Sequence, residues 1–209
     1  MEIIIINGSP RHDGNTVRMC RAFAEGAESS GKNISTRMIH LCDLEFKGCR
    51  SCFACKLKGG KSYGTCAVKD ALSPVLERVK KADALVLASP VYFMDVTGTM
   101  RSFLERLLFP LATYEAGDRT IAPRRMPVVM IYTMNVPREM APLAMMDDLE
   151  RFVGHVFSPP RRLCAYNTYQ FRDYSKYIVE VFSEADKRRY RDDIFPQELR
   201  AAEEMGREI

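Results

Sequence analysis

Short apolar runs alternate with helical patterns along most of the sequence, and this alternation constrains the fold more than any other feature. The first run, residues 3–6, is four consecutive isoleucines, as in a parallel strand that is covered on both faces. Turn-forming residues and then residues with helical spacing follow it. The repeated order of strand and helix predicts an α/β fold, with a doubly wound five-stranded parallel sheet and helices on both faces.

The predicted elements fill one domain that spans residues 1–209. We expect Asn15 to cap the first helix and Gly31 to end it. The segment 109–127 contains Gly117 and three prolines, so it is predicted to be a long connection. The strands are expected at residues 3–6, 34–41, 84–88, 128–133 and within 162–169, and the helices at about 16–30, 70–81, 98–108, 143–156 and 197–208.

Composition and charge narrow the classes of protein to consider. The chain is 46% apolar and 28% charged, which is typical of a globular protein. Its net charge of +4 suits a small anionic ligand and does not indicate a nucleic-acid partner. The basic run 187–191 precedes Asp192 and Asp193, so we expect a solvated helix face there. The N-terminal apolar run is too short for a signal peptide and no stretch is long enough to span a membrane, so we expect a cytoplasmic protein without a membrane partner.

Phosphate-binding residue types gather between the first strand and the first helix. Ser9 and Thr16 supply hydroxyl groups, Asn15 an amide, and Arg11 a planar cationic fork. A helix N-terminus adds unpaired backbone N–H groups and a partial positive charge. Walker and dinucleotide motifs are both missing from this sequence. The set therefore predicts a site for a phosphate monoester, whereas an ordinary turn would explain each residue alone. His12 lies in the same loop and either contacts the phosphate or faces solvent.

A second loop with aromatic residues follows the third predicted strand. In an open α/β sheet the loops after the first and third strands are neighbours, so this loop is expected beside the phosphate loop. Its rigid proline and aromatic surface suit a flat ring, although they can also simply cover the end of the sheet. The residues in question are Pro90, Val91, Tyr92, Phe93 and Met94.

Four of the seven cysteines are spaced as if they shared one function. Cys49, Cys52 and Cys55 form a C-x2-C-x2-C motif, and Cys66 follows after a glycine-containing insertion. A ferredoxin signature begins in the same way, so the four are candidate ligands of a [4Fe–4S] cluster. Zinc binding and a redox-active thiol pair are the alternatives. The remaining cysteines are expected to be small buried residues, and two histidines to be structural: Cys20, Cys42, Cys164, His40 and His155.

The segments 7–16 and 89–98 together resemble the NADPH-dependent FMN reductase family and its iron–sulfur flavoprotein relatives. The resemblance implies a flavodoxin-like fold with the FMN phosphate at the first loop and the isoalloxazine ring near residues 90–94. It also implies a third flavin loop after the fourth strand, where Thr133, Met134 and Asn135 replace the glycine-rich version of many members. A homo-oligomer, with a dimer as the expected form, follows from the resemblance and from the segment 109–127.

The expected function is that of an FMN-dependent oxidoreductase. Hydride would come from NAD(P)H, and electrons would pass to a small-molecule acceptor or a redox-protein partner. The flavin carries this chemistry, so no side chain is assigned as catalytic. Two alternatives remain open: a non-catalytic electron carrier that contains flavin and a cluster, and a redox sensor built on the cysteine loop.

Overall fold

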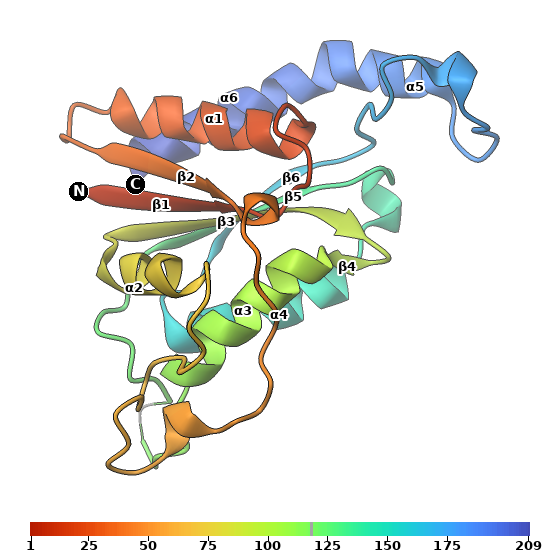
Figure 1. Ribbon diagram of the computed structural model, residues 1–209. Coiled ribbons are helices and arrows are strands. Elements are labelled where there is room, and N and C mark those ends of the chain that lie inside the picture. Colours follow the sequence, from red (N-terminus) through yellow and green to blue (C-terminus); the bar gives the residue numbers. More distant parts are fainter. Residues whose placement is uncertain (118) are drawn as a thin grey trace.

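The computed structural model describes residues 1–117 and 119–209, and its centre is a parallel sheet (Figure 1). The strands are β1 (Glu2–Asn7), β2 (Ser35–His40), β3 (Ala84–Tyr92), β4 (Asp95–Val96), β5 (Val128–Thr133) and β6 (Arg161–Ala165). Five of them are parallel in the order β2-β1-β3-β5-β6, and β4 pairs antiparallel with the end of β3. The five-stranded parallel sheet is confirmed, and β4 is an addition to it.

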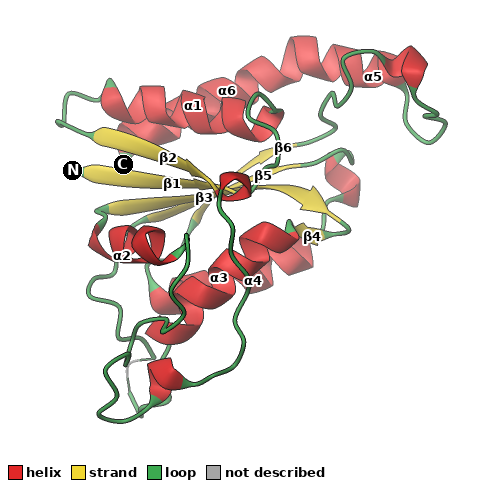
Figure 2. Cartoon of the chain, viewed as in Figure 1, coloured by secondary structure: helices red, strands yellow, loops and turns green. Residues whose placement is uncertain are grey.

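Helices cover both faces of this sheet, as the layers in Figure 2 show. On one face lie α1 (Asn15–Glu28) and α6 (Phe195–Glu208), and on the other α2 (Ser73–Lys81), α3 (Gly98–Leu111) and α4 (Leu143–Val156). The short helix α5 (Glu184–Arg189) continues through the π-turn η5 (Tyr190–Ile194) into α6. Each face has its own apolar core, because the side chains of β1 and β3 alternate between the two faces.

The closest helix contact is between α1 and α6. Gly26 of α1 lies against the backbone of Glu203, and Gly206 of α6 lies against the backbone of Phe23. A Cβ atom at either glycine would overlap these backbone atoms, so the pair of glycines sets how closely the helices approach. This contact holds the C-terminal helix against the domain.

Four local expectations are wrong in their boundaries. Gly14, rather than Asn15, occupies the N-cap position of α1, and Ser29, rather than Gly31, occupies its C-cap position. The helix α3 continues through residues 109–111, because Pro110 and Leu111 are buried against the core. The strand β3 extends four residues beyond Ala88, because Ser89 and Pro90 still pair with β5. Asp118 of the predicted connection lies outside the described residues.

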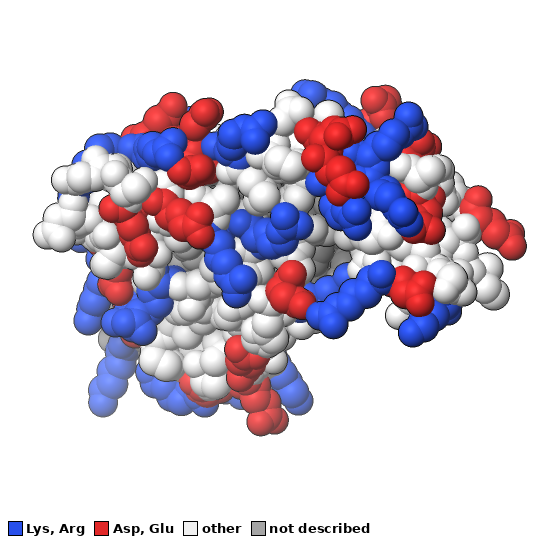
Figure 3. Space-filling view, turned by 90° about the horizontal axis from the view of Figure 1, so that it is seen from above, with Lys and Arg blue, Asp and Glu red and all other residues white. Residues whose placement is uncertain are grey.

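Within the described ranges, every helix falls short of the length and apolar character that crossing a membrane demands. Figure 3 shows the molecule from the side of α1 and α6. Basic and acidic side chains interleave on that face, so its surface charge is mixed.

Candidate functional site

Three loops meet at the edge of the sheet where β1, β3 and β5 end. The first joins β1 to α1, the second joins β3 to α3, and the third follows β5. These strands are adjacent and parallel, so their carboxyl ends lie side by side. In open α/β sheets this edge is the usual place for a ligand.

Buried hydrogen bonds join the three loops into one unit. Thr97 Oγ1 donates to the carbonyl oxygen of Gly8 over 2.9 Å, which links the second loop to the first. The hydroxyl groups of Thr16 and Thr133 lie 2.7 Å apart, which links the first loop to the third. All three threonines are buried. These hydrogen bonds fix the positions of the three loops relative to one another.

The first loop presents donors that suit an anion. Within the described chain, α1 begins without a side-chain cap, and no acidic residue stands in its first turn. Its first N–H groups and the positive end of the helix dipole are thus available to an anion. Ser9 is buried, and its hydroxyl accepts from the backbone N–H of Arg11 over 3.2 Å.

The segment after β6 contacts two of the predicted phosphate-binding residues, Arg11 and Asn15, and the sequence did not predict this contact. The exposed Arg11 donates through Nη1 to the carbonyl oxygen of Gln170 over 2.8 Å, and Asn15 Nδ2 donates to Tyr169 over 3.0 Å. The segment after β6 therefore lies against the first loop. Arg11 has five N–H donors, so a bond to Gln170 leaves others for a phosphate.

The second loop is a tight β-hairpin. Val91 pairs with Val96 and Tyr92 with Asp95, which leaves Phe93 and Met94 as a two-residue turn. Both turn residues have positive φ, 49° and 64°, as a type I′ turn requires. Asn and Gly normally fill such positions, and larger side chains there cost about 1–2 kcal/mol each. The strained turn projects Phe93 fully into solvent, with Tyr92 and Met94 also exposed.

The third loop contains a buried acceptor that lacks a partner. Asn135 Oδ1 is inaccessible to solvent and has no hydrogen-bond partner among the described residues. The carbonyl oxygen of the same residue accepts from Lys187 Nζ over 2.8 Å. A buried acceptor without a donor destabilises a protein, so this atom is expected to meet a ligand N–H or O–H group.

Lys187 is buried, contrary to the expectation of a solvated helix face. Its side chain is 1% exposed, and Nζ also donates to Asn167 Oδ1 over 2.9 Å. Burial lowers the pKa of this ammonium to about 8, because the charged form loses its hydration. Lys187 thus connects α5 to the third loop and to the segment after β6, a role for which the sequence around it carries no signal.

The four predicted cluster ligands do come together, but away from the three loops. Cys49, Cys52, Cys55 and Cys66 line one cavity of about 20 Å³ against the last turns of α3. In Figure 1 the loop that carries them, orange and yellow, runs beside α3 toward the end of that helix. Phe109 lies eleven residues, or about 16 Å, along the helix from Gly98. The four thiols therefore lie toward the opposite end of α3 from the second loop.

The environments of these thiols differ. Burial raises the pKa of Cys55, the nearby Lys56 lowers it, and the thiols of Cys49 and Cys52 add a smaller upward contribution. The exposed Cys52 accepts from the backbone N–H of Ala54, and this hydrogen bond, followed by the nearby Arg50, lowers its pKa. All seven cysteines are free thiols.

A buried arginine of α3 closes the base of the cysteine loop. Arg106 is 2% exposed and donates to the carbonyl oxygen of Lys47 (3.1 Å) and to that of Val68 (3.2 Å). The guanidinium binds both carboxylate oxygens of Asp70, at 2.5 and 3.0 Å. Its Nε atom also donates to Cys66 Sγ over 3.2 Å. One side chain therefore holds the two ends of the loop together.

The other cysteines and histidines divide into expected and unexpected cases. Cys20 is buried, as predicted, and burial raises its pKa to about 12. Cys42 is exposed, so the prediction that it is a small buried residue is wrong. His40 accepts from Asn7 Nδ2 over 2.8 Å, and His12 is exposed beside Cys42.

Comparison with known proteins agrees with this architecture. A model of the NADPH-dependent FMN reductase family matches residues 1–139. An iron–sulfur flavoprotein of Archaeoglobus fulgidus is 36% identical over 124 residues, which are 59% of this chain and 57% of that protein. One of Methanocaldococcus jannaschii is 35% identical over 106 residues, or 51% of each. The chain thus spans about half the length of the curated relatives it matches.

Solved structures match over nearly the whole chain. An NAD(P)H:quinone oxidoreductase from Methanothermobacter marburgensis has a TM-score of 0.67 at 15% identity, with 99% of this chain and 96% of that chain covered. An azoreductase from Bacillus anthracis has a TM-score of 0.70 at 12% identity, with both chains fully covered. A flavodoxin from the domain Archaea has a TM-score of 0.52 at 15% identity and covers 100% of this chain and 96% of that one. At these identities the likeness concerns the fold, which is flavodoxin-like.

Proposed function

Because the chain belongs to the NADPH-dependent FMN reductase family, we propose that it binds FMN and oxidises NAD(P)H, with electrons passing to a small acceptor or a redox protein. The observation that carries this proposal is the meeting of three loops, joined by hydrogen bonds through Thr97, Thr16 and Thr133, at the carboxyl edge of the sheet. When bound, FMN supplies the hydride and electron chemistry.

The residues present fit the two ends of FMN. The uncapped start of α1 and the cation of Arg11 suit the phosphate monoester. The orphaned Oδ1 atom of Asn135 suits the single ring N–H of the isoalloxazine. The exposed hairpin residues Tyr92 and Phe93 offer aromatic and backbone surface for the ring.

In this proposal the chain orients the cofactor and excludes water, and it does not supply an acid or a base. Lys187 holds the third loop in position through the carbonyl oxygen of Asn135. The strained hairpin presents Phe93 and Met94 outward, where they can cover the ring and restrict access of acceptors to it.

Titration with FMN and with FAD tests the cofactor assignment. Arg11→Ala should weaken FMN binding by about 1.5–3 kcal/mol, or about 10- to 150-fold, because a charge-assisted contact to phosphate is lost. Arg200→Ala, at an exposed position of α6, is the matched control and should bind FMN as the wild type does. An unchanged FMN dissociation constant in Arg11→Ala would contradict the phosphate site.

Anaerobic stopped-flow reduction separates the enzyme from a non-catalytic carrier. Rapid bleaching of the flavin by NADPH or NADH alone is the expected result. Bleaching only in the presence of another reduced protein would favour the electron carrier.

A second proposal is that the cysteine loop holds a [4Fe–4S] cluster. Its support is that four thiols line one cavity and that the curated relatives are named iron–sulfur flavoproteins. The number and type of ligand atoms, four cysteine sulfurs, match those of a [4Fe–4S] cluster. The cavity between them has room for about one water, so the loop must open to admit a cluster. Such a cluster would supply one-electron transfer. Arg106 would then donate a hydrogen bond to one ligand, Cys66, which tunes a reduction potential.

Anaerobic reconstitution with iron and sulfide tests the cluster. The wild type should take up about four irons per chain and gain a broad visible band. Cys52→Ser should lose both and still bind FMN, whereas Cys164→Ser should behave as the wild type. A wild type that takes up no iron would exclude the cluster and favour a thiol-based redox sensor, in which the low pKa of Cys52 makes it the reactive group.

We also propose that the protein forms a homodimer, and Phe109 of the expected segment lines the groove that supports it. Leu111 is buried in the core, so it is not available to a partner, whereas Tyr114 is exposed. An apolar groove of about 640 Å³ lies between α3 and α4 and includes Leu104, Met145 and Phe152. Light scattering that gives a monomer mass across a wide concentration range would refute the dimer.

A further inference from the structure

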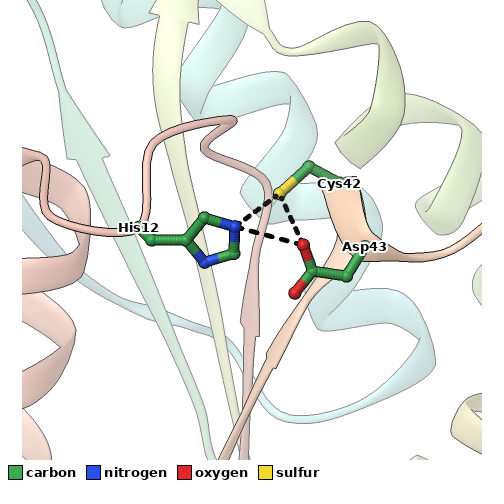
Figure 4. A group of neighbouring side chains, drawn as sticks. All are labelled: His12, Cys42 and Asp43. Atoms are coloured by element: carbon green, nitrogen blue, oxygen red, sulfur yellow. Dashed lines mark hydrogen bonds and ion pairs between the residues drawn. The ribbon is translucent and has the colours of Figure 1, made fainter.

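Three ligand atoms of different chemistry face one point beside the phosphate loop. His12 projects from the loop between β1 and α1, and Cys42 and Asp43 belong to the 3₁₀ turn η1 (Leu41–Asp43) that follows β2 (Figure 4). His12 Nε2 lies 3.1 Å from Asp43 Oδ1 and 3.8 Å from Cys42 Sγ. Cys42 Sγ lies 3.5 Å from the same carboxylate oxygen. The three atoms thus form a closed triangle.

The triangle is not arranged as a catalytic triad. In a triad the histidine contacts the nucleophile through one ring nitrogen and the carboxylate through the other. Here a single nitrogen, Nε2 of His12, approaches both the sulfur of Cys42 and the oxygen of Asp43. Such an arrangement directs all three atoms toward a common centre and does not relay a proton between them.

The edges of the triangle match those of a tetrahedral metal site. Zinc binds nitrogen and oxygen at about 2.0–2.1 Å and sulfur at about 2.3 Å. At tetrahedral angles these lengths place nitrogen about 3.3 Å from oxygen, and sulfur about 3.6 Å from either. The distances in this protein are 3.1, 3.8 and 3.5 Å, so each lies within about 0.3 Å of the expected edge.

The elements that carry these side chains are firmly anchored. Leu41 is fully buried, which fixes the turn that carries Cys42 and Asp43. The ring of His40 lies 4.5 Å from that of His12, and the buried Asn7 holds His40 through its Nδ1 atom. His12 itself is about half exposed, so an ion can reach the site from solvent.

From this geometry we propose that His12 Nε2, Cys42 Sγ and Asp43 Oδ1 bind one divalent transition-metal ion of the Zn²⁺ class. Imidazole and thiolate select zinc, cobalt or nickel, whereas magnesium and calcium prefer sites made of oxygen alone. Binding releases the thiol proton of Cys42 to solvent. Three protein ligands leave the fourth tetrahedral position open to water or to a small anion.

This site is separate from the four cysteines of the proposed cluster and does not depend on FMN. Cys49, Cys52, Cys55 and Cys66 line a different cavity, against the end of α3. Thiolates are ligands for divalent metals, so a test must detect the difference that the new site makes. Co²⁺ serves as the probe, because a cobalt–thiolate bond gives a charge-transfer band in the near ultraviolet.

Anaerobic titration of the reduced protein with Co²⁺ compares the wild type with Cys42→Ser, His12→Gln and Asp43→Asn. Each variant should bind one Co²⁺ fewer per chain, or bind it about 100-fold more weakly, because loss of a ligand exceeds the 10–100-fold effect of an outer-shell change. The difference spectrum between wild type and His12→Gln should contain a cobalt–thiolate band. His155→Gln, exposed on α4, should match the wild type.

The outcomes are distinct. Equal stoichiometry and affinity in the wild type and all three variants would show that the triangle is a hydrogen-bonded surface cluster, and would overturn the proposal. Loss of the ion in Cys42→Ser alone would also overturn it, since a single thiol would then explain the binding. Far-ultraviolet circular dichroism establishes that each variant is folded, and the isosteric Asp43→Asn remains informative if another variant is not.

Discussion

Replacing Arg106 by methionine should destabilise the protein and release the cysteine loop. The substitution removes a buried cation and leaves the Asp70 carboxylate without its bidentate partner. It also removes the donors that bind the carbonyl oxygens of Lys47 and Val68. Methionine replaces the aliphatic stem of the arginine, so the variant keeps part of the packing while it loses every hydrogen bond of the guanidinium.

The size of the effect follows from the burial of the pair. Removing one partner of a buried ion pair costs about 3–5 kcal/mol. Asp70 is 20% exposed, so water partly solvates the carboxylate that remains, and we expect the lower end, about 3 kcal/mol. The control is Arg124→Met, which breaks the exposed pair with Asp83 and should cost about 0.2–1 kcal/mol.

Urea unfolding of the apoprotein measures both values. Hydrogen bonds from Arg106 hold the pKa of Asp70 below its ordinary value, so this pair stabilises the native state above the unfolded pKa of Asp70. Its contribution is lost as the pH falls through the folded pKa. The wild type should therefore lose more stability in acid than Arg106→Met. The double variant with Asp70→Asn should recover part of the loss.

Two results would refute this reasoning. The first is an equal cost for Arg106→Met and Arg124→Met, which would mean that burial does not strengthen the pair. The second is an unchanged reactivity of Cys66 toward a thiol reagent, because loss of Arg106 should expose that sulfur.

Three further predictions concern the packing, the hairpin and the buried lysine. Gly26→Ala should lower the free energy of unfolding in urea by about 1–3 kcal/mol or more, because the new Cβ meets the α6 backbone. Gly98→Ala is the control: its Cβ has open space, so stability should change by less than about 1 kcal/mol. Equal effects of the two substitutions would contradict the close contact between the helices. Met94→Gly should raise thermal stability by about 0.5–1 kcal/mol, because glycine adopts a positive φ without strain. A less stable Met94→Gly variant would argue against strain in the hairpin. Phe93→Ala, in the same turn, should weaken FMN binding. Burial lowers the pKa of Lys187 to about 8, so the unfolded state binds more protons than the folded state between pH 8 and the ordinary lysine pKa. The stability of the wild type should therefore rise across that pH window relative to that of Lys187→Met. Parallel profiles of stability against pH for the two proteins would count against this.

The fold was predictable because its signals are local. Apolar runs and helical spacing indicate where each strand and helix lies, and the helix at Leu143–Val156 and the strand at Val128–Thr133 match the expected ranges in full. The boundaries that differ depend on contacts with distant residues. Pro90 remains in a strand because it pairs with Thr133, more than forty residues later in the chain, and no local pattern records that pairing.

The sequence predicted only those parts of the candidate site whose positions follow from the order of the parallel strands. Residues that follow adjacent parallel strands must meet, which is why the first and second loops could be placed together. The contacts of Lys187 and Gln170 with these loops depend on how the chain returns after β6, and the local sequence does not indicate that path. Phe93 and Met94 do not have the composition of a type I′ turn, so the hairpin was also missed.

The way Arg106 closes the cysteine loop also bears on how such a domain can change over generations. Arg106 of α3 binds both ends of the loop, at Lys47 and at Val68 and Asp70, so residues 48–67 form an insertion between two anchored ends. A longer, shorter or different insertion leaves the contacts of Arg106 with Lys47, Val68 and Asp70 in place. A cysteine-containing loop of this kind can thus be gained or lost as an interchangeable module while the sheet is inherited unchanged.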